Sequence, residues 1–424
     1  MREKSSEFGS RQAWVVCLVG ALFFFYTFIQ MAILDSLGEP MMRELGLKAP
    51  DIAKLASCYF YGNILFLFPA GILLDRISTR KIMLICLAIM TSSTLGLAFV
   101  NGLAVAMLCK FIFGLCGAFC LLSCVRLASR WFPPHKLAFV IGVLLMLAMS
   151  GSLVAETPFT LLSDYLGWRM SFGVDALIGV VIAAAIFCFV KDSPSDSPDL
   201  GHQHGGPSFR RSIFKVLRYS QNWLAGAYTS LMNLPVMIMF VFGSLFLEQG
   251  YGFDRTGASL VMMVFLVGVI LGCPAFGFIS DKWGRRKAPM ILASIAALVV
   301  IWPLFQMDHL SSREVEILFF SLGFITSAQV ISYPLIAEGN PPELTGTAEG
   351  VASVLIMLGG FSPLLFAYFL RWHWTPQYIN HIPQYGLMNY HNALLLMPIS
   401  LACALLTAFF LKDSRQKKPR ESHS

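Results

Sequence analysis

Four ionisable side chains stand inside or at the edge of long apolar segments, where a charge is costly to place. Lys110 and Glu156 lie within such segments, Asp35 ends the first of them and Glu338 closes the tenth. Ionisable groups in apolar surroundings are usually paired or functional. A carboxylate in a low dielectric can exchange a proton near neutral pH. We therefore expect Glu156 to bind a proton or a cationic group, with Lys110 as a counter-charge; a structural ion pair between two helices is the alternative.

A second group consists of uncharged polar side chains within the apolar segments, which can hydrogen-bond a solute. Its members are Tyr26, Gln30, Tyr59, Tyr61, Asn63, Asn233, Gln329 and Tyr333. Pro334 follows Tyr333 and frees a backbone carbonyl close to two of these side chains. Each of them singly also fits a contact between packed helices, but together they indicate a polar organic solute.

Two basic residues at the end of the fourth apolar segment are further candidates for contact with a substrate. Arg126 and Arg130 are one helical turn apart there, and they can draw an anionic substrate inward. Charges that only set membrane topology explain them equally well. All eight histidines lie outside the apolar segments or at their margins, so we expect proton coupling to use carboxylates, and we expect no metal site.

The composition places these side chains in a bilayer. Of the 424 residues, 56% are hydrophobic and 13% are charged, about half the charged share of a soluble domain. The net charge of +7 is spread in short clusters between apolar runs, which is the pattern of membrane topology. A soluble enzyme, a nucleic-acid-binding protein and a disordered chain are therefore excluded. The ten cysteines have no spacing framework and are expected to pack as small hydrophobic residues.

Twelve runs are long enough to cross the hydrocarbon as helices, which takes about 20 residues each. They lie near residues 13–35, 54–74, 82–101, 103–125, 137–162, 168–190, 222–247, 256–280, 287–307, 314–337, 345–370 and 389–411. Most Lys and Arg residues fall into the termini and every second loop, which predicts that both termini face the cytoplasm.

The longest loop divides the twelve spans into six plus six. We expect an N-terminal six-helix bundle over 1–190, a cytoplasmic linker over 191–221, a C-terminal bundle over 222–412 and a tail over 413–424. Within the linker, residues 209–219 mix apolar and basic side chains. This pattern fits a short amphipathic helix on the inner leaflet, and a solvated linker end is the alternative.

The two halves repeat one loop. Residues 71–81 (GILLDRISTRK) follow the second span, and residues 277–287 (GFISDKWGRRK) follow the eighth. The ends of the halves also match, with Lys-Asp-Ser at 191–193 and again at 412–414. Related halves of six spans are typical of transporters.

The aspartates of the repeated loop stand at inner helix ends, where they can pair with cations or cap a neighbouring helix. We expect a gating latch on the cytoplasmic side; for the cations of the loop, charges that only set membrane topology are the alternative. Its candidate residues are Gly71, Asp75, Arg76, Arg80, Gly277, Asp281, Lys282 and Arg286.

The repeated loop resembles the principal signature of the major facilitator superfamily, G-x-x-x-D-[R/K]-x-[G/S]-x-[R/K]-[R/K]. Residues 110–117 (KFIFGLCG) are similar to its fourth-span motif, with Lys in place of Arg, and 131–134 and 167–169 resemble features of solute symporters. Ser78 replaces the usual Gly of the loop. The resemblance implies an all-α membrane fold of two six-helix bundles.

The expected function is that of a secondary transporter of the inner (plasma) membrane, not an enzyme. The solute is a small polar organic compound (an organic anion, amino acid or peptide), moved by alternating access and coupled to protons in symport. The fifth span lacks the G-x-x-x-G-P-x-x-G-G pattern of drug antiporters. Efflux of amphiphilic compounds by proton antiport is the alternative, since 20 Met and 36 Phe residues can line an adaptable cavity. We expect a monomer without cofactors, metal or nucleic acid.

Overall fold

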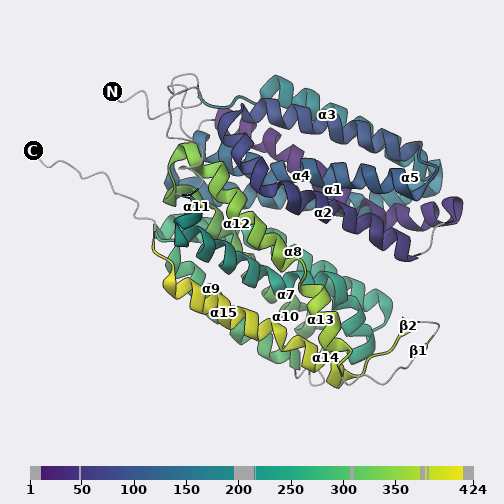
Figure 1. Ribbon diagram of the computed structural model, residues 1–424. Helices are drawn as coiled ribbons and strands as arrows, with labels where there is room; N and C mark the ends of the chain where they lie inside the picture. Colours follow the sequence, from purple (N-terminus) through teal and green to yellow (C-terminus); the bar gives the residue numbers. More distant parts are fainter. Residues whose placement is uncertain are drawn as a thin grey trace, which may run out of the picture. The chain divides into compact units, whose positions relative to one another are not determined.

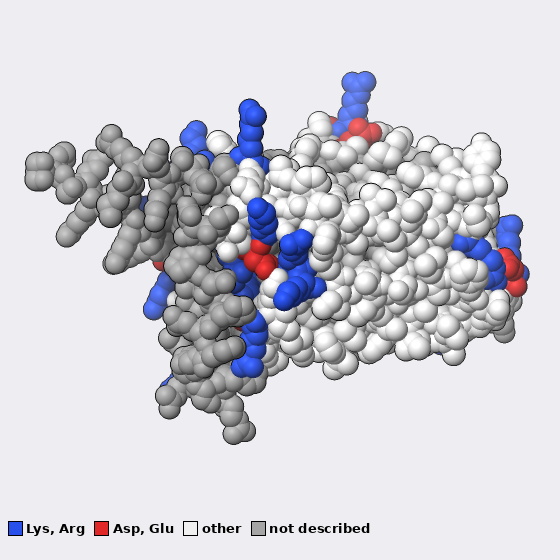
Figure 2. All heavy atoms as spheres, turned by 90° about the horizontal axis from the view of Figure 1, so that it is seen from above, with Lys and Arg blue, Asp and Glu red and all other residues white. Residues whose placement is uncertain are grey.

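The computed structural model describes residues 11–46, 49–194, 214, 216–305, 310–372, 378–379 and 382–413. Among these residues it contains twelve helices that are long and apolar enough to cross a membrane, from Arg11–Leu34 to Leu387–Phe410. The predicted number of spans is therefore confirmed, and the chain is a multi-pass membrane protein. In Figure 2 a broad face carries few charged side chains, and Lys and Arg gather mainly toward the two ends of the helices. This is the charge distribution that a bilayer requires.

The first compact unit comprises residues 1–219 together with Ile336–Ser353. Its helices, seen in purple to blue-green in Figure 1, are α1 (Arg11–Leu45), α2 (Ala49–Arg76), α3 (Thr79–Ala98), α4 (Leu103–Trp131) and α5 (Pro134–Phe189). Helix α5 is two spans that meet at Gly167, whose φ of 79° is not helical. A residue with a side chain rarely adopts this conformation, so glycine permits the sharp turn between the fifth and sixth spans.

Helix packing in the first unit follows from small residues on facing helices. Helix α1 packs against α4 and α5, and α2 packs along α4. The close approach of two backbones is clearest at Gly71, where a Cβ atom would collide with the carbonyl oxygen of Gly346. Small residues allow helices in a membrane to approach this closely.

The second compact unit comprises Ser220–Leu335 and Val354–Ser424. From Ser220 onward the elements of the chain are, in order, α7 (Ser220–Tyr251), α8 (Arg255–Trp283), α9 (Lys287–Ile301), η2 (Trp302–Phe305), α10 (Ser312–Thr326), η4 (Ser327–Ile331), α11 (Ser332–Gly339), η5 (Pro342–Leu344), α12 (Thr345–Gly359), α13 (Ser362–Leu370), β1 (Tyr378–Ile379), β2 (Ile382–Pro383), α14 (Leu387–Leu394) and α15 (Leu396–Phe410). The end of α11, η5 and the start of α12 belong to the first unit. The two short strands pair antiparallel, with Ile379 opposite Ile382.

The helix of the tenth span, Ser312–Gly339, is interrupted within its length. Its α-helical part α10 gives way to the 3₁₀ turns of η4 before α11 resumes the α-helix. Pro334 lies in the first turn of α11 and has no N–H to donate to the preceding carbonyl. The break therefore lies where the sequence predicts a freed backbone carbonyl.

Most of the predicted amphipathic linker helix, residues 209–219, lies outside the described residues. Of this stretch, Phe214 and residues 216–218 are described and helical. Phe214 is exposed, whereas Val216 is buried. The boundaries predicted for the two bundles, the linker and the tail stay a prediction.

Candidate functional site

A cluster of polar side chains is buried between four spans of the first unit. Gln30 of α1, Lys110 of α4 and Asp175 of α5 are each at most 1% exposed. The amide of Gln30 donates a hydrogen bond to Oδ2 of Asp175. The ammonium of Lys110 donates to the backbone carbonyl of Gln30 at 2.7 Å and attracts the Asp175 carboxylate. An anion and a cation therefore share one enclosed site.

The hydroxyl of Tyr26 extends this cluster toward α3. It lies 2.9 Å from Oγ1 of Thr94, and its ring packs against the backbone at Gly179, one turn after Asp175. Tyr26 also interacts electrostatically with Asp175. Tyr26, Gln30 and Lys110 are three of the candidates singled out from the sequence, and the structure brings them together.

Two oxygen atoms of the cluster are buried and have no hydrogen-bond partner among the described residues: Oδ1 of Asp175 and Oε1 of Gln30. Buried acceptors are normally satisfied, because an unpaired one loses its hydration without replacement. The cluster therefore has the capacity to accept a proton or a donor.

The sequence analysis missed Asp175, although the signal was present. It is a carboxylate in the middle of the predicted sixth span, residues 168–190, and the criterion that selected Lys110 and Glu156 also applies to it. Glu156 and Asp35, which were selected, lie on α5 and α1, but their side chains are outside the described residues. The pairing of Glu156 with Lys110 stays a prediction.

The remaining polar candidates occupy different surroundings. Tyr61 is 60% exposed, whereas Asn63 is buried and donates to the carbonyl of Gly114. Tyr59 and Tyr333 are both 6% exposed. Glu338 is partly exposed on α11.

In the second unit, polar groups meet at the broken tenth span. The amide of Gln329 donates to Oδ1 of Asn233 on α7 at 3.3 Å. One turn away, the hydroxyls of Thr229 and Ser332 are hydrogen-bonded. A 3₁₀ stretch inside a helix is often a hinge or a binding position. The pair of Asn233 and Gln329 is the second place at which a solute could find hydrogen-bond partners.

Asp75 of the repeated loop caps the start of α12 inside the first unit. Its carboxylate accepts from the backbone N–H of Gly346 at 2.9 Å and of Thr347 at 2.7 Å, and from the Thr347 hydroxyl at 2.6 Å. Arg126 lies 3.7 Å away and is 4% exposed. A carboxylate at a helix N-terminus is stabilised by the unpaired N–H groups and by the helix dipole. The sequence signal for this contact was the position of Asp75 at an inner helix end.

The matching aspartate of the second half is held differently. Asp281 forms an ion pair of 2.6 Å with Arg286, which is 1% exposed and also donates to the hydroxyl of Ser280. Lys282 is exposed and lies over the ring of Phe278, and Arg76 is exposed too. Gly277 is buried. The guanidinium of Arg80 donates to the carbonyl of Phe187.

The repeated Lys-Asp-Ser ends supply caps that the sequence analysis did not assign. Asp192 accepts from the N–H of Arg80 at 2.9 Å and from the hydroxyl of Ser78, at the start of α3. Asp413 accepts from the N–H groups of Arg286 and Lys287 at 2.7 and 2.9 Å, at the start of α9. Each half therefore ends on a carboxylate that caps its own third helix.

Glu349 on α12 is a further buried carboxylate, 1% exposed, and it lies half a turn after Thr347. Neither of its carboxylate oxygens has a hydrogen-bond partner among the described residues. Glu349 was not among the candidate residues singled out from the sequence.

A cluster at the opposite end of the first unit ties three segments together. Arg169, directly after the Gly167 turn, pairs with Glu44 at 2.9 Å and donates to the carbonyls of Ala98 and Val100 at the end of α3. The indole of Trp168 also donates to Glu44. Hydrogen bonds from Arg169 and then Trp168 hold the pKa of Glu44 below its ordinary value. This arrangement fixes the outer ends of the spans.

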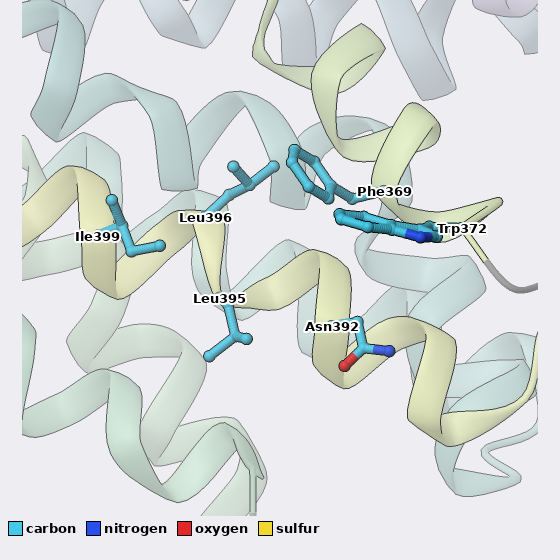
Figure 3. Close-up of a pocket in the computed structure, with 6 residues that line it drawn as sticks. All are labelled: Phe369, Trp372, Asn392, Leu395, Leu396 and Ile399. Carbon is cyan, nitrogen blue, oxygen red and sulfur yellow. The ribbon is translucent and has the colours of Figure 1, made fainter.

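Figure 3 shows a pocket of about 340 Å³ in the second unit. Its six lining side chains are Phe369, Trp372, Asn392, Leu395, Leu396 and Ile399. Only Asn392 is polar, and Leu395 and Ile399 are at least half exposed on the apolar surface. A lining without charge, on a surface that faces lipid, does not match the polar solute that the buried clusters indicate.

The sequence profile of the Major Facilitator Superfamily matches residues 16–363. The chain belongs to the major facilitator superfamily. The resemblance carried by residues 71–81 and 277–287 is thereby confirmed, and so is the all-α fold of twelve spans in two bundles. Described members of this family are transporters.

Among curated relatives, the probable sulfoacetate transporter SauU of Cupriavidus necator is 21% identical over 79% of this chain and 82% of its own length. The purine ribonucleoside efflux pump NepI of Escherichia coli is 26% identical over 63% of this chain. The match spans 66% of the length of NepI.

Two solved structures share the fold. The Escherichia coli fucose:proton symporter FucP has a TM-score of 0.70 and 14% identity, covering 93% of this chain and 99% of its own. The proton:xylose symporter XylE has a TM-score of 0.74 and 14% identity, covering 95% of this chain and 96% of its own. At this identity the likeness concerns the fold.

Proposed function

We propose that this superfamily member moves a small polar organic solute by alternating access, in symport with protons. The observation that carries the proposal is the buried cluster of Gln30, Lys110 and Asp175, which holds a cation, an anion and two unpartnered acceptors within one bundle. Such groups are costly at membrane depth and mark solute or ion pathways. We place the protein in the inner (plasma) membrane as a monomer with both termini in the cytoplasm.

An organic anion is the solute class with the best support, ahead of amino acids and peptides. Lys110 is a buried cation of the polar cluster, and charge-assisted hydrogen bonds from a cation to an anionic group are strong. Arg126 adds a second buried cation on the same helix. The name of SauU points to a small organic anion as the solute of that relative.

Counterflow in proteoliposomes tests this function. Vesicles are loaded with an unlabelled solute, and uptake of the labelled solute is measured for sulfoacetate, dicarboxylates, amino acids and dipeptides. We expect exchange of at least one small anion. Lys110→Gln should weaken the apparent affinity of the protein for this anion roughly tenfold or more, since a hydrogen bond to a charged group contributes about 1.5–3 kcal/mol. The matched control is Lys136→Gln, because Lys136 is exposed.

The proposal fails if the wild type exchanges none of these solutes, or if Lys110→Gln binds the anion as well as the wild type does. Efflux of amphiphilic compounds by proton antiport is the second candidate function. It is favoured by the name of NepI, an efflux pump, and by the many Met and Phe residues. Extrusion of a labelled apolar amine by vesicles that are acidic outside, without exchange of anions, would select it.

A further inference from the structure

We propose that the pocket of Figure 3 binds one anionic phospholipid, with its phosphate group at Arg371 and one of its acyl chains against the apolar lining. The pocket lies within the second unit, between the end of α13 and the junction of α14 and α15. Its volume of about 340 Å³ falls within the range of about 300–1,000 Å³ that is usual for small-molecule sites. The inference concerns the lipid around the protein and is independent of the proposed transport function.

A proline accounts for the hollow in the twelfth span. Pro398 lies in the first turn of α15 and has no N–H to donate to the carbonyl of Leu394, four residues earlier. The span is interrupted at Leu395, where α14 ends and α15 begins. Figure 3 shows Phe369 and Trp372 across the pocket from this junction. The interrupted helix therefore forms one wall of the pocket, and the end of α13 forms the other.

The pocket has a polar end and an apolar end. The eleventh span ends at Leu370 and the twelfth begins at Leu387, so these two positions lie on the same side of the membrane. Trp372 and Asn392 are close to these span ends, whereas Ile399 is roughly 18 Å further along the twelfth span at 1.5 Å per residue. Tryptophan is enriched at the level of the lipid headgroups. The order of the lining thus matches a lipid, with its headgroup at the interface and its chain below.

Arg371 provides charge complementarity at the polar end. It directly precedes Trp372 and is exposed, and its guanidinium has no ion pair or hydrogen bond within the described part of the chain. The exposed side-chain amide of Asn392 has no partner there either. A guanidinium binds phosphate oxygens through charge-assisted hydrogen bonds. A net anionic headgroup is the better match, because a zwitterionic one brings a second cation close to Arg371.

The pocket opens toward the bilayer, so a lipid can enter it from the side. Trp372, Leu395 and Ile399 are 54%, 50% and 58% exposed, and they belong to the apolar surface of the second unit. None of the six lining side chains carries a charge. A membrane lipid is the amphiphile that such a surface meets at the highest concentration, and its acyl chain needs no polar partner.

The test measures contact between lipid and Trp372 in the full-length protein, reconstituted in phosphatidylcholine vesicles. Bromine atoms on an acyl chain quench tryptophan fluorescence on contact, so brominated phosphatidylglycerol and brominated phosphatidylcholine are titrated separately. The signal of Trp372 is the difference between the wild type and Trp372→Phe. We expect half-maximal quenching at a mole fraction of phosphatidylglycerol roughly fivefold below that of phosphatidylcholine, which is the effect of one cation near an anionic lipid.

Variants separate the headgroup contact from general attraction to anionic lipid. Arg371→Gln should abolish the fivefold preference, and Arg371→Lys should retain most of it. Arg313→Gln is the matched control, because Arg313 is exposed at the start of the tenth span, on the same side of the membrane; it should keep the preference. Leu406→Trp supplies a second reporter, since Leu406 is 60% exposed on α15 and does not line the pocket. We expect equal quenching by both lipids at this position.

Three outcomes would overturn the inference. The first is equal quenching of Trp372 by the two lipids in the wild type, and the second is a preference that survives Arg371→Gln or is as strong in Leu406→Trp. The third is no quenching of Trp372 by either lipid together with the mass of a dimer in detergent, which would assign the pocket to a second copy of the chain. Each of these results leaves counterflow untouched, so they differ from a failure of the proposed function.

Discussion

Three buried carboxylates of the first unit differ in what surrounds them. Asp75 accepts three hydrogen bonds from Gly346 and Thr347 and lies beside Arg126. Asp175 accepts one bond and is attracted by Lys110. Glu349 has no hydrogen-bond partner among the described residues. A buried charge is retained when partners replace its water, so these three positions should respond differently to the loss of their charge.

The surroundings of Glu349 lead to a prediction about stability. Glu349→Gln removes the possibility of a charge at a site where the described residues offer the carboxylate no hydrogen bond. We expect the melting temperature in detergent to stay the same or to rise. Asp75→Asn, measured in parallel, should lower it, because its charge-assisted hydrogen bonds contribute roughly 1.5–3 kcal/mol each. A clear loss of stability in Glu349→Gln would show that the carboxylate has a charged or hydrogen-bonded role that the prediction denies.

At the scale of elements, two helices take their N-terminal caps from the far end of their own half. Helix α3 receives Asp192, which follows the sixth span, and α9 receives Asp413, which follows the twelfth. The first turn of a helix has N–H groups without partners in the helix, and carboxylates satisfy them. The repeated Lys-Asp-Ser ends therefore close each bundle at its inner side.

Removal of these caps should destabilise each bundle. We expect Asp192→Ala and Asp413→Ala each to cost about 0.5–2 kcal/mol, the usual loss for an N-cap side chain. The measurement is unfolding by heat or denaturant in detergent. Asp254→Ala provides the control, because Asp254 occupies the N-cap of α8 without a side-chain cap bond. Equal stabilities of all three variants would argue against a capping role for the repeated aspartates.

At the scale of the whole molecule, α12 is the element that bears on gating. It begins in the first unit, where Asp75 caps it, and continues into the second unit from Val354 onward. Alternating access requires the two halves to change their relation to each other. We therefore propose that the cap at Asp75, with Gly71 allowing the close approach, acts as the latch of the cytoplasmic side. Among the other latch candidates, the side chains of Asp281 and Arg286 pair with each other within one loop of the second half.

The latch makes a kinetic prediction. Asp75→Asn should leave solute affinity within about twofold, because the described contacts of Asp75 are with the start of α12 and with Arg126, and not with the cluster of Gln30, Lys110 and Asp175. It should slow counterflow roughly ten- to hundredfold, since the loss of about 1.5–3 kcal/mol shifts the balance between conformations. Asp51→Asn, at the other end of α2 and paired with the exposed Lys54, is the control. Unchanged counterflow in Asp75→Asn would refute the latch.

Local properties of the sequence were sufficient to predict the number of spans, the six-plus-six division and the superfamily. A membrane span depends on the hydropathy of about 20 consecutive residues, and residues 71–81 and 277–287 carry the family signature in contiguous stretches. The polar side chains of Lys110, Gln30 and Tyr26 could likewise be recognised within spans from the sequence alone. Asp175 also lies within a span, but its place in the cluster depends on residues that are distant in the sequence.

Only the tertiary structure decided which of these groups meet. Asp175 and Gln30 are 145 positions apart, and Asp75 and Thr347 are 272 apart. Such contacts depend on the packing of spans, and hydropathy does not encode it because every span is apolar on most of its faces. The role of Asp192 and Asp413 was likewise hidden, since a carboxylate is a cap only when the packing brings it to the N-terminus of another helix. The sequence alone therefore determined that this protein is a twelve-span carrier, and the packing determined which charges share a site.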